Sequence, residues 1–430
     1  MRGVIRRGAR HPRFALTVIV IAAIVIRIPL LRQPGAPPDL RWFMNWAWTM
    51  QAQGLNAAYD VAGSNYPPLY LYVLDGLGHA AVALHLAGFG PTDAIEIPLP
   101  MALTVFLKLP GVAADALLGL VVYKAARRLS GHRAGVWAMA MVLFNPALLY
   151  ATAWWGQIDS LQTLFMVVAI DAALAGTMVF SGAAYTLALL TKLQSIVVAP
   201  VLAVLAVRSG RRQVAAGLLG GIATAVIGLA PFILSSHLAA VFDVYKGADR
   251  TFPFATGSAF NLWALVQPAQ LVPDTQAVAP GWWSYERLGL TLLAAWTILV
   301  VVWLACQRAP WAAWQASAAL ALGFFCLAPQ MHERYLYPAL AFLAVVLPCR
   351  RIFRLLFAAL SATFLANLVA SKPFFRPVTD SAWLYGRLHI AVSAANVAIL
   401  LCCGLLLALD AGAVRLPNLM VWRPAGPQLD

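Results

Sequence analysis

The stretch VAAGLLGGIATAVIGLAPFIL, residues Val214–Leu234, contains no charged side chain and follows closely on Arg211 and Arg212. A helix needs about 20 predominantly apolar residues to cross the hydrocarbon core of a bilayer. The stretch therefore predicts a membrane-spanning helix. Because Lys and Arg are enriched in cytoplasmic loops, the two arginines predict that this helix begins on the cytoplasmic side.

The composition of the whole chain agrees with this local signal. Of the 430 residues, 62% are hydrophobic and only 11% are charged, whereas a soluble domain is roughly half apolar and about a quarter charged. This excludes a disordered chain and disfavours a soluble multi-domain enzyme. The five cysteines are odd in number and lack metal-binding spacing, so they indicate neither a disulfide framework nor a zinc site.

Apolar runs of the same kind recur along the chain. They are Phe14–Leu30, Tyr66–Leu86, Leu99–Tyr123, Gly135–Trp154, Leu161–Phe180, Ala183–Leu190, Ile196–Val207, Leu288–Ala305, Ala312–Leu327, Tyr335–Leu347, Ile352–Val369 and Ile390–Leu409. We therefore expect an all-α polytopic membrane protein, a single transmembrane domain over residues 1–430, with about 11–13 transmembrane helices.

The basic clusters predict the topology. Of the 30 Lys and Arg residues, 18 lie at the N-terminus, near the C-terminus or in clusters between the runs, such as Lys124–Arg133, Arg208–Arg212 and Arg350–Arg354. Placing all of them in the cytoplasm predicts a multi-pass protein of the cell membrane with both termini cytoplasmic. The net charge of +14 is then explained by topology and does not indicate a nucleic-acid partner.

Two long segments are then external. The first, residues 31–98, must contain an even number of crossings, so Tyr66–Leu86 is predicted to be an interfacial or re-entrant helix. The second comprises residues 236–286. The short runs on either side of Lys192 contain too few residues to cross alone, which predicts two partial-depth helices meeting at Thr191–Ser195.

The first external segment carries an acidic residue directly after the first run. Asp39, in Pro37-Pro38-Asp39-Leu40, either caps the helix that follows or acts as a catalytic group. Tyr66, in Tyr66-Pro67-Pro68-Leu69, stands at the end of the same segment, where prolines ordinarily begin a helix. Taken singly, these positions do not distinguish structure from function.

Two further patches place polar side chains inside or at the end of predicted membrane spans. Gln157 and Asp159, in Gly156-Gln157-Ile158-Asp159-Ser160, are candidates for substrate binding, although Asp159 is equally a candidate helix cap. Lys192 interrupts an apolar region, where an ionisable side chain is costly unless it faces a polar cavity or a partner. An ammonium group there suits an anion such as phosphate, and snorkelling to the interface is the alternative.

The last patches lie in late external segments. Pro329-Gln330-Met331-His332-Glu333-Arg334 places an imidazole, a carboxylate and a guanidinium in one turn. We predict that His332 and Arg334 bind phosphate and that Glu333 contacts substrate, the alternative being a salt-bridged interfacial turn. Asn261 and Trp263 are candidates for sugar binding, although an ordinary interfacial loop has the same composition.

Taken in chain order, these patches resemble the GT-C superfamily of integral-membrane glycosyltransferases, between about residues 20 and 345. The features that carry the resemblance are Asp39 soon after the first span, Tyr66-Pro-Pro-Leu closing the first external loop and His332 in a late external loop. In particular, they resemble the bacterial relatives of dolichyl-phosphate-glucose-dependent glucosyltransferases and polyprenol-phosphate-mannose-dependent mannosyltransferases. Asn261-Leu-Trp263 is similar to the bacterial members.

The resemblance implies a GT-C-like fold, with Asp39 as catalytic base, His332 as a ligand of the donor phosphate and Arg334 as its neighbour. The first external loop has no Asp-X-Asp pair, so the resemblance implies no bound metal and no other cofactor. The residues after Asp39 depart from the eukaryotic pattern, which leaves the acceptor open.

We therefore expect an inverting glycosyltransferase that moves a hexose, mannose or glucose, from a polyprenyl-phosphate donor to an acceptor hydroxyl at the external membrane face. Its partners would be the lipid-linked donor, membrane lipids and a glycan, lipid or protein acceptor, with no nucleic acid. The alternatives are a secondary transporter, a lipid-linked glycan flippase, and a membrane polymerase or ligase with a diphosphate-linked donor.

Overall fold

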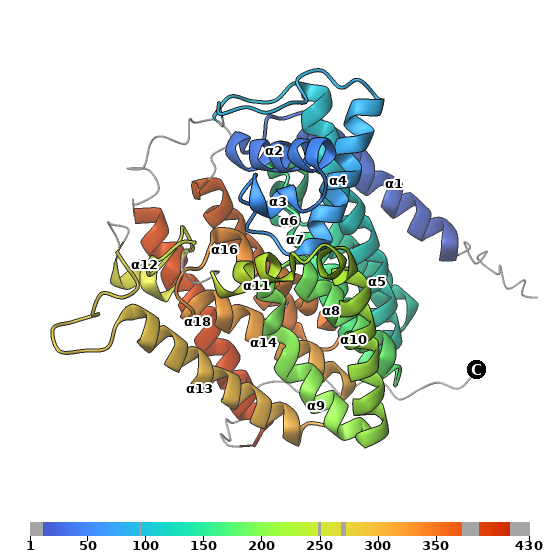
Figure 1. Ribbon diagram of the computed structural model, residues 1–430. Coiled ribbons are helices and arrows are strands. Elements are labelled where there is room, and N and C mark those ends of the chain that lie inside the picture. The colour runs from blue at the N-terminus through green and yellow to red at the C-terminus, as the bar shows by residue number, and fades with distance from the viewer. Residues whose placement is uncertain (1–11, 95, 248–250, 268–271, 372–386, 413–430) are drawn as a thin grey trace, which may run out of the picture.

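The computed structural model describes residues 12–94, 96–247, 251–267, 272–371 and 387–412, which form a bundle of helices (Figure 1). The described residues form no β-strands, only a few isolated β-bridges within the segment 254–332. The first loop and its flanking helices are α1 (Pro12–Leu31), α2 (Pro37–Gln53), α3 (Ala57–Asp60), α4 (Pro68–Ala83) and α5 (Met101–Leu143). The all-α prediction is confirmed.

The remaining elements follow in chain order. The middle of the chain forms α6 (Pro146–Leu149), the π-helix η1 (Tyr150–Trp155), α7 (Asp159–Leu174), α8 (Met178–Thr191), the 3₁₀-helix η2 (Leu193–Val198), α9 (Ala199–Ser209), α10 (Arg211–Leu234), α11 (Leu238–Lys246) and α12 (Leu262–Val266). The last part forms α13 (Tyr285–Cys306), α14 (Pro310–Leu327), the 3₁₀-helix η3 (Glu333–Leu336), α15 (Tyr337–Val346), α16 (Arg351–Ser371) and α18 (Arg387–Asp410).

Among the described helices, 7 are long and apolar enough to cross a membrane. They are α1, α5, α10, α13, α14, α16 and α18, and the shorter apolar segments are α8 and residues 193–209. The 43 residues of α5 include non-helical Ser130 and Gly131, so two helices meet there, as the separate runs Leu99–Tyr123 and Gly135–Trp154 predict. The polytopic membrane fold is thus confirmed.

Two of the expected runs are divided. Within Gly135–Trp154, α5 ends at Leu143, and α6 and η1 follow it. The sequence predicts a continuous run over Leu161–Phe180, whereas α7 ends at Leu174 and α8 begins at Met178. Between them Gly176 has a φ of +77°, a left-handed conformation that commonly terminates helices and that glycine adopts without a Cβ clash. The predicted break near Lys192 is present, because Lys192 itself is extended, with φ −155° and ψ 139°.

The first loop forms a compact layer at one end of the bundle. Helix α2 lies across this end and packs on α4 (Figure 1), and buried Phe43, Met44 and Tyr70 form part of their shared apolar core. The close approach needs Gly78, because a Cβ there would lie 2.4 Å from the carbonyl oxygen of Ala47. Helix α4 has 16 residues and is not among the 7 membrane-spanning candidates, in line with the predicted interfacial helix.

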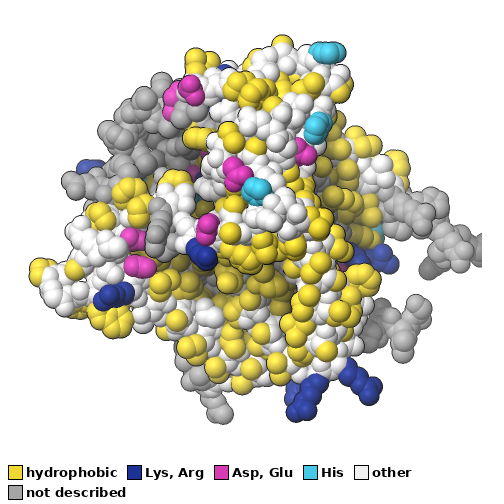
Figure 2. All heavy atoms as spheres, in the orientation of Figure 1, with side chains coloured by type: hydrophobic (Ala, Val, Ile, Leu, Met, Phe, Trp, Pro, Cys, Tyr) yellow, Lys and Arg dark blue, Asp and Glu magenta, His cyan; other side chains and the backbone are white. Residues whose placement is uncertain are grey.

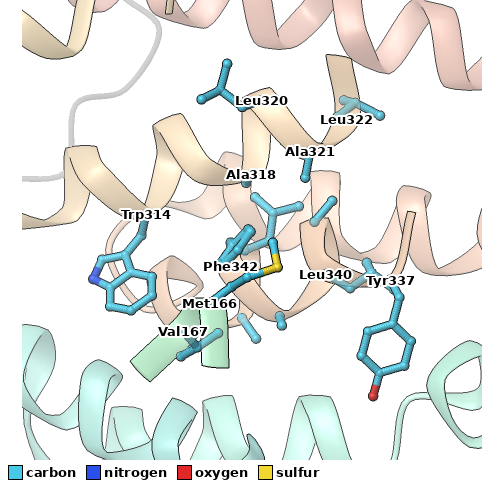
Figure 3. Close-up of a cluster of buried hydrophobic side chains, with 14 of the residues drawn as sticks. Met166, Val167, Trp314, Ala318, Leu320, Ala321, Leu322, Tyr337, Leu340 and Phe342 are labelled. Carbon is cyan, nitrogen blue, oxygen red and sulfur yellow. The ribbon is translucent and has the colours of Figure 1, made fainter. Parts of the chain in front are cut away.

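Helices α14 and α15 form the centre of the bundle. Phe342 of α15 lies between Met166 of α7 and Ala318 of α14 (Figure 3), within one buried apolar cluster. Every residue of α15 is buried. By contrast, α10 turns apolar side chains such as Ile227 outward, and yellow side chains dominate the visible face of the bundle (Figure 2). Such an apolar surface is stable in lipid rather than in water.

A buried ionic network joins α1, α5, η1 and α15. Arg27 donates to Asp115 Oδ2 at 2.9 Å, and both side chains are 2% exposed. Thr152 and Tyr337 donate hydroxyl hydrogen bonds to the same carboxylate at 2.6 and 2.7 Å, and Arg27 also donates to two backbone carbonyl oxygens. The charges are thus hydrogen-bonded on both sides, as a buried pair requires.

The basic clusters meet at the opposite end of the bundle, where Lys and Arg side chains lie below α9 and α10 (Figure 2). Arg208 donates to the carbonyl oxygen of Gln307 at 2.7 Å, and Arg350 pairs with Asp410 at 2.7 Å. The side chain of Gln307 donates to the carbonyl oxygen of Asp410. The ends of α9, α13 and α18 and the start of α16 therefore share one end, as the predicted topology requires.

Candidate functional site

A cavity of about 100 Å³, partly open to solvent, lies where the first-loop layer meets the ends of the bundle helices. Its walls include Tyr66 before α4, Lys192 after α8, Tyr245 of α11 and Arg334 of η3. Four distant parts of the chain thus meet around it. Three of the predicted site residues, Tyr66, Lys192 and Arg334, line this cavity directly.

Asp39 lies in the first turn of α2 and is partly buried. The capping interpretation is wrong, because Ala36 occupies the N-cap and no side chain caps this helix. Instead, Asp39 Oδ2 accepts a hydrogen bond of 2.5 Å from the indole nitrogen of Trp155. The guanidinium of Arg334 stands 5.8 Å from the centre of the same indole, so Trp155 is in contact with both Asp39 and Arg334.

The turn after α14 places His332 beside Arg334. The ring of His332 packs edge-on against Phe252 at 4.3 Å between centroids. A backbone hydrogen bond of 2.8 Å from Gly257 to Met331 fixes the turn, and a Cβ at Gly257 would lie 3.2 Å from the imidazole. Glycine thus permits the second long loop to cover the histidine.

Glu333 lies between the two basic groups of this turn. Its carboxylate is 3.9 Å from His332 and 3.5 Å from Arg334, so the salt-bridged turn considered from the sequence exists. Burial lowers the pKa of His332, so the imidazole is predominantly neutral at pH 7. Arg334 remains charged and supplies the permanent positive charge of this turn.

Lys192 and Asp159 form a buried pair. Lys192 Nζ donates to Asp159 Oδ1 at 3.0 Å, with side-chain exposures of 6% and 0%, and lies 5.4 Å from the centre of the Tyr66 ring. Asp159 begins α7 without capping it, so the capping interpretation is wrong here too. Its second oxygen, Oδ2, is buried and has no hydrogen-bond partner in the described part of the chain.

Other buried polar atoms at the site are also unpaired. Gln157 Oε1 and His332 Nε2 have no hydrogen-bond partner within the described ranges. An unpaired buried polar group costs about 1–3 kcal/mol, so such groups are well suited to contact polar substrate atoms. Burial also raises the pKa of the Tyr66 hydroxyl, which keeps it protonated as a hydrogen-bond donor.

Asn261 and Trp263 have structural partners and do not line this cavity. Asn261 caps α12 by accepting from two backbone N–H groups and donates to the carbonyl oxygen of Phe325. The indole of Trp263 donates to the carbonyl oxygen of Leu327 at 2.9 Å. These hydrogen bonds attach the second long loop to the end of α14, so both residues stabilise the position of this loop and do not contact the cavity.

The sequence analysis missed two residues at the site. Trp155 attracts no functional prediction from the sequence, because tryptophan is ordinary at a membrane interface. Lys108 lies inside the apolar run Leu99–Tyr123, and the rule that drew attention to Lys192 applies to it as well. Among the described residues, no group of three or more His, Cys, Asp or Glu side chains could hold a metal ion.

The architecture is that of a polytopic membrane protein, and its candidate site lies at one end of the bundle, where the Asp39 carboxylate stands near basic side chains. The solved structure of ArnT from Cupriavidus metallidurans bound to undecaprenyl phosphate is similar, with 18% identity, 91% of this chain and 77% of that chain covered, and a TM-score of 0.50. The apo structure of the same protein gives the same values. This similarity confirms the expected fold.

An oligosaccharyltransferase from Archaeoglobus fulgidus in the apo form is more distantly similar, with 14% identity and a TM-score of 0.45. The match covers 93% of this chain and 56% of that one, so this chain spans about half the length of that protein. No protein-family model and no curated protein sequence matches the chain.

Proposed function

We propose that the protein is an inverting glycosyltransferase that transfers a hexose, mannose or glucose, from a polyprenyl-phosphate donor to an acceptor hydroxyl. The observation that carries the proposal is the contact of Trp155 with both the Asp39 carboxylate and the Arg334 guanidinium. A candidate proton acceptor thus lies on one side of an indole ring, and a candidate anion-binding group that lines the cavity lies near the same ring. The fold similarity to an undecaprenyl-phosphate-bound protein supports a lipid-linked donor.

In the proposed reaction, Asp39 accepts the proton of the acceptor hydroxyl while the hydroxyl oxygen attacks the anomeric carbon. The bond from that carbon to the phosphate oxygen breaks, and the polyprenyl phosphate leaves with the electron pair. Attack opposite the leaving group inverts the anomeric centre. Arg334 stabilises the negative charge on the departing phosphate, and His332 donates a hydrogen bond to it.

The remaining groups have different proposed roles. Lys192 is paired with Asp159, so in the proposed complex its ammonium group contacts both Asp159 and the donor phosphate. Gln157 and Asp159 accept hydrogen bonds from substrate hydroxyls through their unpaired oxygens. Glu333 orients Arg334, and Tyr66 donates its hydroxyl. The proposal assigns no step to a metal ion or other cofactor.

The proposed location follows from charge and chemistry. The end of the bundle that carries Arg208 and Arg350 faces the cytoplasm, with both chain termini, because basic residues are retained there. The cavity at the other end then opens to the external face. A polyprenyl chain anchors the donor in that leaflet, and the acceptor is a glycan, a lipid or a protein that reaches it.

A donor screen tests the proposed function. The purified protein in lipid nanodiscs is mixed with synthetic polyprenyl-phosphate mannose or glucose and a membrane extract, and products are identified by mass spectrometry. We expect one donor to be consumed and one hexose to be added to a single class of acceptor. Movement of the lipid across a vesicle bilayer without any transfer would instead support a flippase.

The Arg334→Gln substitution tests the phosphate site. We expect the KM for the donor to rise about 10–100-fold, because a charge-assisted contact to phosphate contributes about 1.5–3 kcal/mol. Arg287→Gln, at an arginine away from the cavity, is the control and should leave the KM unchanged. An unchanged KM in both variants would contradict the assignment of Arg334.

The lowered pKa of His332 predicts how donor binding depends on pH. A bound phosphate favours the imidazolium form and raises the pKa of His332, so donor binding takes up a proton. The affinity should therefore increase as the pH falls from 7.5 to 5.5. In His332→Gln this increase should disappear. Equal pH dependence in both proteins, measured as the donor Kd, would exclude His332 from the phosphate site.

A further inference from the structure

Lys108 is a buried lysine that has no carboxylate partner among the described residues. It lies in α5 and is 1% exposed. Its Nζ donates to the backbone carbonyl oxygens of Gln33 at 2.8 Å and Trp154 at 2.6 Å. Within the described residues, no carboxylate lies within 4.0 Å of it. An ammonium group in such surroundings is costly, so its position calls for an explanation.

The two carbonyl acceptors account for the local stability of Lys108. Gln33 follows the end of α1, and Trp154 lies in the last turn of η1. The last carbonyls of a helix have no partner within the helix and carry partial negative charge. Lys108 therefore joins the segment just after α1 to the carboxyl end of η1, two regions that are far apart in the sequence.

Both of these regions lead directly to Asp39. After Gln33 the chain passes against η1 at Gly35, where φ is +69° and a Cβ would lie 2.6 Å from the carbonyl oxygen of Trp155. Helix α2 then begins, with Asp39 in its first turn. From the end of η1, Trp155 donates its indole hydrogen bond to Asp39. Lys108 thus joins the segments that carry the two partners of this hydrogen bond.

We infer that Lys108 is a positioning residue that acts through the Asp39–Trp155 hydrogen bond and fixes the orientation of the Asp39 carboxylate. It does not line the cavity, so it acts without touching substrate. The inference rests on the proposed function, in which Asp39 accepts the acceptor proton. It adds a specific residue that the glycosyl-transfer reaction depends on.

The Lys108→Met substitution tests this role with a side chain of similar length and no charge. We expect kcat to fall about 100-fold with an unchanged KM for the donor, because a misplaced catalytic group costs rate on this scale. Lys108→Arg keeps donors for both carbonyls and should recover most of the rate. In an Asp39→Asn background, Lys108→Met should have no further effect on the residual rate, which a merely structural role would not produce.

The control for folding is Arg208→Met. Arg208 also donates to two backbone carbonyl oxygens, those of Leu304 and Gln307, but at the opposite end of the bundle. We expect it to lower the thermal unfolding temperature without changing kcat. Equal losses of kcat from Lys108→Met in the wild-type and Asp39→Asn backgrounds would overturn the inference. If wild-type protein transfers no sugar from any donor, the proposed function itself fails, whichever way the Lys108 variants behave.

Discussion

We expect Asp39→Asn to lower kcat by about 10²–10⁴-fold and to leave donor binding intact. The expected loss is the contribution of a general base positioned within hydrogen-bond reach of the proton it removes. The amide is nearly the same size as the carboxylate, and its oxygen can still accept the hydrogen bond from Trp155 that the carboxylate accepts now. Single-turnover transfer and a separate measurement of donor Kd distinguish the rate from the binding.

The control for this experiment is Asp93→Asn, at an exposed acidic residue of the same loop. It should transfer sugar at the wild-type rate. Near-wild-type turnover in Asp39→Asn would show that another group accepts the proton. A parallel loss of donor binding would instead place Asp39 among the groups that bind the donor.

Asp115→Leu should be the most destabilising substitution in the chain. It removes the carboxylate that accepts from Arg27, Thr152 and Tyr337 and leaves the guanidinium of Arg27 buried. Breaking a buried pair by removing one partner costs about 3–5 kcal/mol. We expect a large fall in the unfolding temperature, which circular dichroism in mild detergent would measure.

The double variant Arg27→Met/Asp115→Leu identifies the cause of that loss. Removing both charges leaves apolar side chains of similar volume, which is often close to neutral for stability. We therefore expect the double variant to recover much of the unfolding temperature. If it is no more stable than Asp115→Leu alone, the unpaired charge is not what destabilises the single variant.

The sequence predicted the helices well because each apolar run is a local signal. It also located the break at Lys192, since a charged residue inside an apolar region is visible without knowing the fold. It missed the glycine break at Gly176, because one glycine in an apolar run does not by itself indicate a turn. The Arg27–Asp115 pair joins residues 88 positions apart, and composition alone cannot show that contact.

The site was only partly predicted, because the sequence shows local motifs and not contacts between distant residues. Asp39, His332 and Arg334 were selected by the order of short motifs, and in the structure Asp39 and Arg334 both contact Trp155, with His332 in the same turn as Arg334. Asn261 and Trp263 were selected by composition, which does not show the direction in which a side chain points. Lys108 was passed over because its acceptors, the carbonyl oxygens of Gln33 and Trp154, are backbone atoms that no residue pattern reveals.

The complete burial of α15 has a consequence for biogenesis. The ribosome makes α5 and α7 long before α15, yet α15 packs against both. The faces of α5 and α7 that contact α15 are therefore exposed to lipid until this later segment is inserted. This exposure costs little free energy in a bilayer, because lipid tails solvate apolar helix faces about as well as a neighbouring helix does. Asp115 can meanwhile pair with Arg27 and Thr152, which are already synthesised, before Tyr337 arrives.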